Sequence, residues 1–218
     1  MIQPKSPARS ADLRDALRDE FRAAWQLLRS ARPDDVVYGF GLYTGHDAKT
    51  LTLVAFTEQG LDDVAQAYAD DEAMDMPNER LMLRWSPADS PLLDTTGTVL
   101  ARSQALRRTL PDVADAAVTY YGEKSARRAA FAAAFSALNS LDEEGLFGEG
   151  SVREAVLLSV WQYDESDADM VAAARKLNPR GVVARYAQAL DERGRVFDAW
   201  MKERIAAARR RKTAEPTR

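Results

Sequence analysis

The stretch from residue 36 to residue 56 limits the possible folds more than any other part of the sequence. It holds two runs rich in β-branched and aromatic residues, 36–43 and 50–56, with a short polar loop between them. Such runs predict two strands, and so short a loop predicts that they pair as an antiparallel hairpin. Gly39 and Gly41 lie two residues apart and share one face of the first strand, so we expect a bulky group, such as a helix, to approach that face closely.

Helical patterns surround this hairpin. Apolar residues recur at steps of three and four over 13–28, and similar patterns predict helices over 61–74, 99–108, 125–141, 168–177 and 182–208. Two short apolar runs, 81–85 and 152–161, predict further strands, and the second is expected at the centre of the sheet because it is the most apolar. The sequence therefore predicts an α+β fold, in which a small mixed or antiparallel sheet of about four strands packs with several helices.

The length of 218 residues suits a single domain. We expect it over 11–204, after a loose leader over 1–10 and before a basic, frayed tail over 205–218. The formal net charge of −4 is unevenly spread, because residues 195–218 carry +5 and residues 1–194 carry −9. Cations near a helix end complement the helix dipole, so we interpret the tail as a solvated helix end. Contact with nucleic acid through 209–212 is the alternative.

Several classes of function are excluded by composition. The chain has no cysteine and a single histidine, His46, which excludes disulfides, thiolate metal sites and cysteine nucleophiles. It contains no phosphate-binding loop, no dinucleotide fingerprint and no serine-hydrolase elbow. We therefore expect no cofactor and no metal. No window approaches the roughly 20 apolar residues of a membrane span, and the N-terminus lacks an apolar signal region, so the sequence predicts a cytoplasmic protein with no membrane partner.

The first acidic run, 58–79, holds eight acidic residues and no basic one. One interpretation is a solvated helix face whose acids also cap the helix. The other is a surface that binds a basic protein. The candidate partner-binding residues are Asp70, Asp71 and Asp75, with Trp85 as either a core aromatic residue or an interface anchor.

A second acidic run, 142–169, holds nine acidic residues and one basic residue, Arg153. Paired carboxylates can perform acid–base chemistry or hold Mg²⁺. Asp164 follows a buried strand, and sites often form where such a strand ends. The catalytic candidates are Asp164, Arg153, Asp142 and Arg84, which we expect to line one pocket if the protein is an enzyme. Turn and capping roles for the acids, with a structural ion pair for Arg153, are the alternative.

Five short motifs occur in a characteristic order. They are Tyr-Gly-Phe-Gly-Leu-Tyr-Thr at 38–44, Arg-Trp-Ser-Pro-Ala at 84–88, Leu-Asp-Glu-Glu-Gly-Leu-Phe-Gly at 141–148, Arg-Glu-Ala-Val-Leu-Leu at 153–158 and Leu-Asn-Pro at 177–179. Over about residues 10–195, this order resembles a family of uncharacterised, mainly bacterial cytoplasmic proteins catalogued as a domain of unknown function. The family pattern has asparagine where this chain has Phe56. Some relatives are thought to lie beside polymorphic-toxin immunity genes, so the resemblance implies an immunity-like or partner-binding role and transfers no catalytic residue.

Together these patterns favour a non-enzymatic protein-binding module, immunity-like or regulatory, with an acidic surface and a basic protein partner. The alternative is a carboxylate- or magnesium-dependent enzyme with its site near Asp164. Nucleic-acid contact through the basic tail is the third hypothesis.

Overall fold

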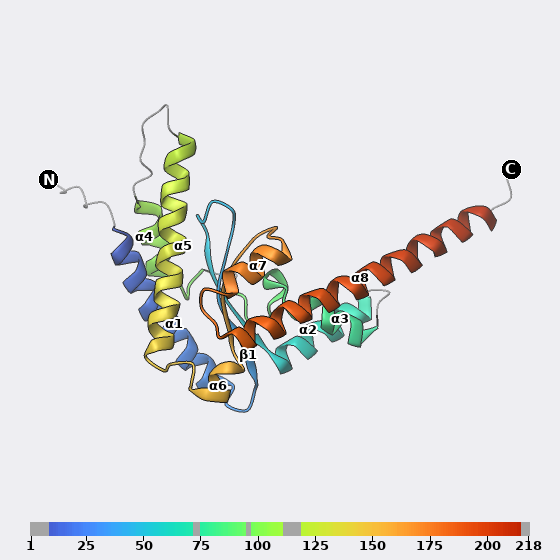
Figure 1. Cartoon of the computed structure of the whole chain (residues 1–218), viewed down its shortest axis with the longest axis horizontal. Helices are drawn as coiled ribbons and strands as arrows, with labels where there is room; N and C mark the ends of the chain where they lie inside the picture. Colours follow the sequence, from blue (N-terminus) through green and yellow to red (C-terminus); the bar gives the residue numbers. More distant parts are fainter. Residues whose placement is uncertain (1–8, 72–74, 95–96, 111–118, 215–218) are drawn as a thin grey trace.

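A computed structural model of the protein describes residues 9–71, 75–94, 97–110 and 119–214. Over these ranges the chain forms helices on both sides of a small sheet (Figure 1). The helices are α1 (Ser10–Ala31), α2 (Glu58–Asp71), α3 (Met76–Leu83), α4 (Ala101–Thr109), α5 (Thr119–Glu143), α6 (Gly150–Glu154), α7 (Asp167–Ala174) and α8 (Arg180–Ala214), with a 3₁₀ turn at Pro87–Asp89. The strands are β1 (Val37–Thr44), β2 (Leu51–Thr57) and β3 (Leu157–Gln162).

The strands form one mixed sheet in the order β2-β1-β3. As the sequence predicts, β1 and β2 pair antiparallel across the short loop, and the structure places Leu42 opposite Leu53. β1 and β3 pair in parallel, with Leu42 opposite Val160. A parallel neighbour requires a long crossover, and the chain from α2 to α6 supplies it. The small mixed sheet and its helices confirm the α+β prediction.

The molecule has three layers (Figure 1). On one side of the sheet lie α1, α4 and α5, and Phe21 and Trp25 of α1 meet Phe40 of β1 with ring centroids 6.0 and 5.3 Å apart. On the other side lie α2, α3, α7 and α8, around Trp161 and Tyr186. The spacing of three and four along each helix turns its apolar residues toward the sheet, and the two cores hold the layers together.

The strand expected over 81–85 is wrong, because this run lies in α3 and the turn after it. Asp75 caps the helix, since its Oδ1 accepts a hydrogen bond from the backbone N–H of Asn78 at 3.1 Å, and Pro77 stands in the first turn. A short apolar run suits a buried strand and a buried helical turn equally well. The upstream cap decides in favour of the helix.

The apolar run 152–161 is shorter as a strand and more peripheral than the sequence predicts. Its first residues belong to α6, and β3 begins at Leu157. β3 is an edge strand, while β1 is central. Leu158 and Val160 are nevertheless buried. Because helices cover both faces of the sheet, even an edge strand in this fold has a continuous apolar sequence.

Both glycines of β1 lie against bulky groups, as expected, but these are aromatic rings and backbone rather than a helix. A Cβ on Gly39 would lie 2.7 Å from the ring of Phe56 and 3.3 Å from that of Trp85. A Cβ on Gly41 would lie 1.9 Å from the backbone oxygen of Ser159. The strand therefore accepts no side chain at either position without moving its neighbours.

The C-terminal part of α8 extends beyond the rest of the molecule (Figure 1). The helix packs on the sheet layer through Val182, Tyr186 and Leu190. It then runs without interruption through Gly194 and includes residues 205–214, which the sequence predicts as a frayed tail. Among the helices that the structure describes, none is both long enough and apolar enough to cross a membrane.

Candidate functional site

Arg153 is a structural anchor. Its buried guanidinium donates hydrogen bonds to the carboxylate of Asp142, to the carbonyl oxygens of Val156 at 2.7 Å and Leu177 at 2.9 Å, and to Oδ1 of Asn178 at 3.2 Å. These bonds tie the C-terminal end of α5 to the start of β3 and to the connection between α7 and α8. All three guanidinium nitrogens are engaged, so the structural ion pair is the better of the two interpretations of this residue.

Arg84 lies beside α2 in a separate network. Its guanidinium donates to both carboxylate oxygens of Glu58 and lies 4.3 Å from the ring centroid of Tyr38. Arg80 also pairs with Glu58 and with Asp62. Two acids of the first acidic run are therefore neutralised within the chain, which weakens the case for a basic partner. Arg80 comes directly after the run and Arg84 five residues after its end, so a count that stops at residue 79 misses both.

The residues predicted to bind a partner are placed differently from one another. Asp70 is exposed and accepts a hydrogen bond from Nε2 of Gln66 at 2.8 Å, and Asp75 is exposed and caps α3. Asp71 ends α2, and its side chain lies outside the described part of the structure. Trp85 is 8 % exposed and packs in the core, so the structure does not present it as a surface anchor.

The network around Glu58 predicts a loss of stability in acid. Burial raises the pKa of Glu58, but hydrogen bonds and charges from Arg84 and Arg80 outweigh it and hold the pKa below its ordinary value of 4.5. The ion pairs thus stabilise the fold above about pH 4.5, and this contribution is lost as the pH falls through the lower pKa of the folded state. We expect Glu58→Gln to have a lower free energy of unfolding than the unmodified chain near neutral pH. On acidification, that free energy should fall by less in the variant than in the unmodified chain. Urea unfolding at about pH 7 and about pH 3 measures the difference, and equal losses in both proteins would contradict it.

The four catalytic candidates do not line a common pocket. Asp142 and Arg153 form one pair, Arg84 pairs with Glu58, and these lie at different pockets from Asp164. Arg153 precedes β3 and Asp164 follows it, so a strand of roughly 20 Å separates them. The single site that the enzyme hypothesis predicts from these four residues is not formed.

Asp164 lines a groove of about 440 Å³ beside the outer edge of β3, which we call the β3 groove. α5 forms one wall, α7 forms the other, and His46 of the hairpin loop also lines the groove. The backbone of Asp164 has φ 58°, a left-handed conformation that aspartate adopts more readily than most residues. This turn sends the chain from β3 into α7 and so shapes the groove.

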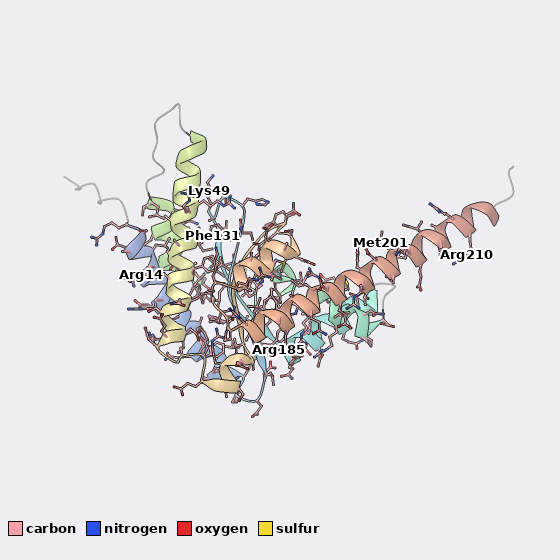
Figure 2. The ribbon with its side chains drawn as sticks, in the orientation of Figure 1. Arg14, Lys49, Phe131, Arg185, Met201 and Arg210 are labelled. Carbon is pink, nitrogen blue, oxygen red and sulfur yellow. The ribbon has the colours of Figure 1, made fainter. Side chains whose placement is uncertain are left out.

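The α5 wall presents one cation and two aromatic rings. Arg127, Phe131 and Phe135 are spaced by four residues and share a face of the helix (Figure 2 labels Phe131). Arg127 donates to Oε1 of Gln162 at 2.7 Å, and Nζ of Lys176 lies 4.5 Å from the ring centroid of Phe135. Among the described residues, neither cation forms a close ion pair: Arg127 is partnered by an amide, and Lys176 by an aromatic ring and by a longer-range attraction to Glu165.

The opposite wall and the end of β3 supply acids. Glu165 accepts a hydrogen bond from the backbone N–H of Gln162 at 3.1 Å, and burial raises the pKa of Glu165. Asp169 accepts a hydrogen bond from Oγ of Ser166 at 2.6 Å. In the described part of the chain, no three histidine or acidic side chains come together as metal ligands. The groove therefore offers both signs of charge around an apolar centre.

The outer edge of β3 forms the floor of this groove. The backbone N–H of Tyr163 donates to the carbonyl of Thr44 at 2.9 Å, so odd-numbered residues of β3 point their backbone groups at β1 and even-numbered residues point theirs outward. Leu158 is one of the outward residues. The side-chain amide of Asn178 satisfies both of its groups, accepting from its N–H at 2.9 Å and donating to its carbonyl at 2.7 Å.

Val160 is the outward residue between two that have partners. Leu158 is capped by Asn178, and the N–H of Gln162 is capped by Glu165. Val160 lines the groove, and no side chain of the described residues forms a hydrogen bond to its outward N–H and C=O. Within the part of the chain that the structure describes, side chains thus cap the edge of β3 on both sides of Val160 and leave Val160 itself open.

Sequence reasoning identified Asp164 at this site but missed Arg127, Phe131 and Lys176. The four-residue spacing from Arg127 to Phe135 was a usable signal that these side chains share a face. The spacing shows only that these side chains share one face of a helix. It does not show which element lies opposite that face, so the groove could not be identified from the sequence.

Residues 17–179 match the model of a family described as a domain of unknown function, DUF4303. The match spans about three quarters of the chain. No curated protein and no solved structure matches the chain.

Proposed function

Because the chain belongs to the DUF4303 family, whose description assigns no function, we propose a function from the groove itself: the protein is a non-enzymatic module that binds an extended segment of another protein in the β3 groove. The segment lies alongside β3 and pairs with its edge at Val160, in the manner of a short added strand. Main-chain hydrogen bonds provide affinity in this mode of recognition, and side chains in flanking pockets provide specificity.

The observation that carries this proposal is the pair of outward backbone groups of Val160. A strand added to an edge bonds to every second residue of that edge. The contact at Leu158 shows what such a bond requires. There the side-chain amide of Asn178 supplies an acceptor for the N–H of Leu158 and a donor for its carbonyl. A bound segment would supply the same pair at Val160. Since a buried group without a partner costs about 1–3 kcal/mol, binding there removes an unfavourable contribution.

Access to the edge requires a movement of the wall. Val160 is 1 % exposed, while Phe131 and Phe135 beside it are half-buried. These rings are the side chains that must turn aside for a segment to reach the strand, and they then pack against its apolar residues. Movement of exposed or half-buried side chains is common when partners bind.

The charges of the groove define the partner. Arg127 and Lys176 suit acidic side chains, and Asp164 and Asp169 suit basic ones. A segment with residues of both signs around an apolar centre therefore fits better than the uniformly basic partner predicted from the acidic run. The immunity-like role implied by the resemblance is one use of such a module and stays a prediction.

The proposal is tested by selecting linear peptides from a random display library on the full chain and measuring the affinity of the synthetic peptides by calorimetry. We expect Val160→Pro and Arg127→Gln each to weaken binding by about tenfold or more, since they remove a donor and a charge from the groove. Arg128→Gln is the matched control, because Arg128 is exposed and does not line the groove.

Val160→Pro tests the groove without breaking the sheet, because the N–H that it removes points outward. Proline is tolerated in an edge strand at such a position. Ser159→Pro, one residue earlier, removes an N–H that faces β1 and is expected to destabilise the fold strongly. Circular dichroism checks whether Val160→Pro is folded. If no displayed peptide binds, or if the folded variant binds as tightly as the unmodified chain, the proposal fails.

A further inference from the structure

The apolar stripe that attaches α8 to the molecule continues onto its projecting part. Tyr186 and Leu190 are buried in the core. Phe197 follows Leu190 by seven residues and Trp200 follows Tyr186 by fourteen, so both continue the same stripe. Phe197 is 42 % exposed and Met201 is 37 % exposed. We call residues 195–210 the arm; Figure 2 labels Met201 and Arg210 on it, and Arg210 lies well away from the other elements.

The arm is basic, whereas the rest of the chain is acidic. Residues 195–210 contain five Lys or Arg and two acidic residues, and residues 1–194 carry a net charge of −9. One of the cations, Arg204, covers the ring of Trp200 at 4.7 Å and leaves its charge at the surface. An exposed apolar stripe flanked by cations fits an acidic surface with small apolar residues.

The chain itself carries a surface of this kind on α2. Asp63 and Asp70 lie seven residues apart on one face of the helix, with Ala67 exposed between them. Asp70 bonds only to the neutral amide of Gln66 among the contacts of the described residues, so its charge is not neutralised. In its own molecule the arm extends past the ends of α2 and α3, because α8 continues as one uninterrupted helix beyond them (Figure 1).

We propose that the arm of one copy packs on the acidic α2 face of a second copy, and that two-fold symmetry repeats the contact. In such an arrangement both copies use the same pair of surfaces, so the assembly closes as a dimer. Pairing of two arms is disfavoured by their like charge. This contact shares no residue with the β3 groove, so the dimer proposal can fail without affecting the proposed peptide binding, and the reverse is also true.

Reciprocal charge reversal tests the contact in the full-length chain. We expect a dimer at about 100 µM by sedimentation or light scattering, and a dissociation constant raised about tenfold or more by Lys202→Glu with Arg204→Glu. Asp63→Lys with Asp70→Lys should weaken the dimer as strongly. Combining all four changes should restore the affinity to within about threefold, because each new charge then faces an opposite one.

Two further variants separate charge from packing. Phe197→Ser with Met201→Ser leaves the charges unchanged and should also weaken the dimer about tenfold, since it removes the apolar stripe. Arg128→Glu with Arg175→Glu makes the same charge change at exposed positions outside the contact and should leave the dimer intact. Three results would overturn the proposal. They are a monomer at all concentrations, a dissociation constant that neither charge reversal changes, and a combined variant whose affinity is not restored. An arm that instead binds DNA or anionic vesicles while the chain stays monomeric would overturn it as well.

Discussion

Gly41→Ala is expected to destabilise the fold severely or to prevent folding. The added Cβ would lie 1.9 Å from the backbone oxygen of Ser159 and 3.2 Å from the ring of Trp161. Gly41 and Ser159 are partners in the parallel pairing of β1 and β3, so the oxygen cannot retreat without separating the strands. Such a clash costs more than about 4 kcal/mol, which is a large part of the roughly 5–15 kcal/mol of a typical domain. We expect either insoluble protein or a Tm lowered by more than about 10 °C in a circular dichroism melt.

Two other glycines provide controls for this substitution. A Cβ on Gly45 would meet nothing closer than the carboxylate of Asp47 at 3.6 Å, which is an ordinary contact. A Cβ on Gly194 would meet nothing within 4 Å, and this residue lies inside α8. Gly194→Ala should therefore stabilise the helix locally by up to about 1 kcal/mol. If Gly41→Ala melted at the same temperature as these two variants, the close pairing of β1 and β3 would be wrong.

Arg153→Ala is expected to destabilise the fold by about 3–5 kcal/mol, because it leaves a partly buried carboxylate without its partner. Asp142 loses its ion pair, and the carbonyl oxygens of Val156 and Leu177 lose their donors. These groups hold α5, β3 and the α7–α8 connection together, so the loss is felt throughout the domain. Urea unfolding, followed by far-UV circular dichroism, measures the change.

Arg185→Ala is the matched control for Arg153→Ala. Arg185 also donates to a backbone carbonyl, that of Glu154, but it is exposed. Water replaces such a contact when it is lost, so the cost should stay below about 1 kcal/mol. Arg153→Lys keeps the charge but cannot reach all the acceptors, and we expect an intermediate loss. A stability of Arg153→Ala equal to that of Arg185→Ala would show that the anchor is not structural.

Much of the fold was predictable because its signals are local. Strand alternation and a short loop identified the β1–β2 hairpin, and steps of three and four identified α1 and the apolar part of α5. The spacing of Gly39 and Gly41 also predicted a close approach, which the rings of Phe56 and Trp161 provide. These features depend on residues within a few turns or strand positions of one another.

The candidate site was only partly predictable. Asp164 was identified because it follows a buried strand, and the structure places it in the β3 groove. Arg127 and Lys176 come from helices that are separate in sequence, so no local pattern connects them. The open backbone groups of Val160 depend on the direction of β3 and on where Asn178 and Glu165 lie. A strand run in the sequence does not tell which of its backbone groups have partners.

By itself, then, the sequence determined most of the helices, the antiparallel hairpin and the mixture of helices with a small sheet, because hydrophobic periodicity and turn residues act over short distances. Only the tertiary structure decided that 81–85 is helical, that β3 lies at the edge, and that Arg80 and Arg84 neutralise acids of α2. It also brought α5 and α7 together around an open strand edge. These outcomes depend on contacts between residues far apart in the chain, where burial and pairing outweigh local preference.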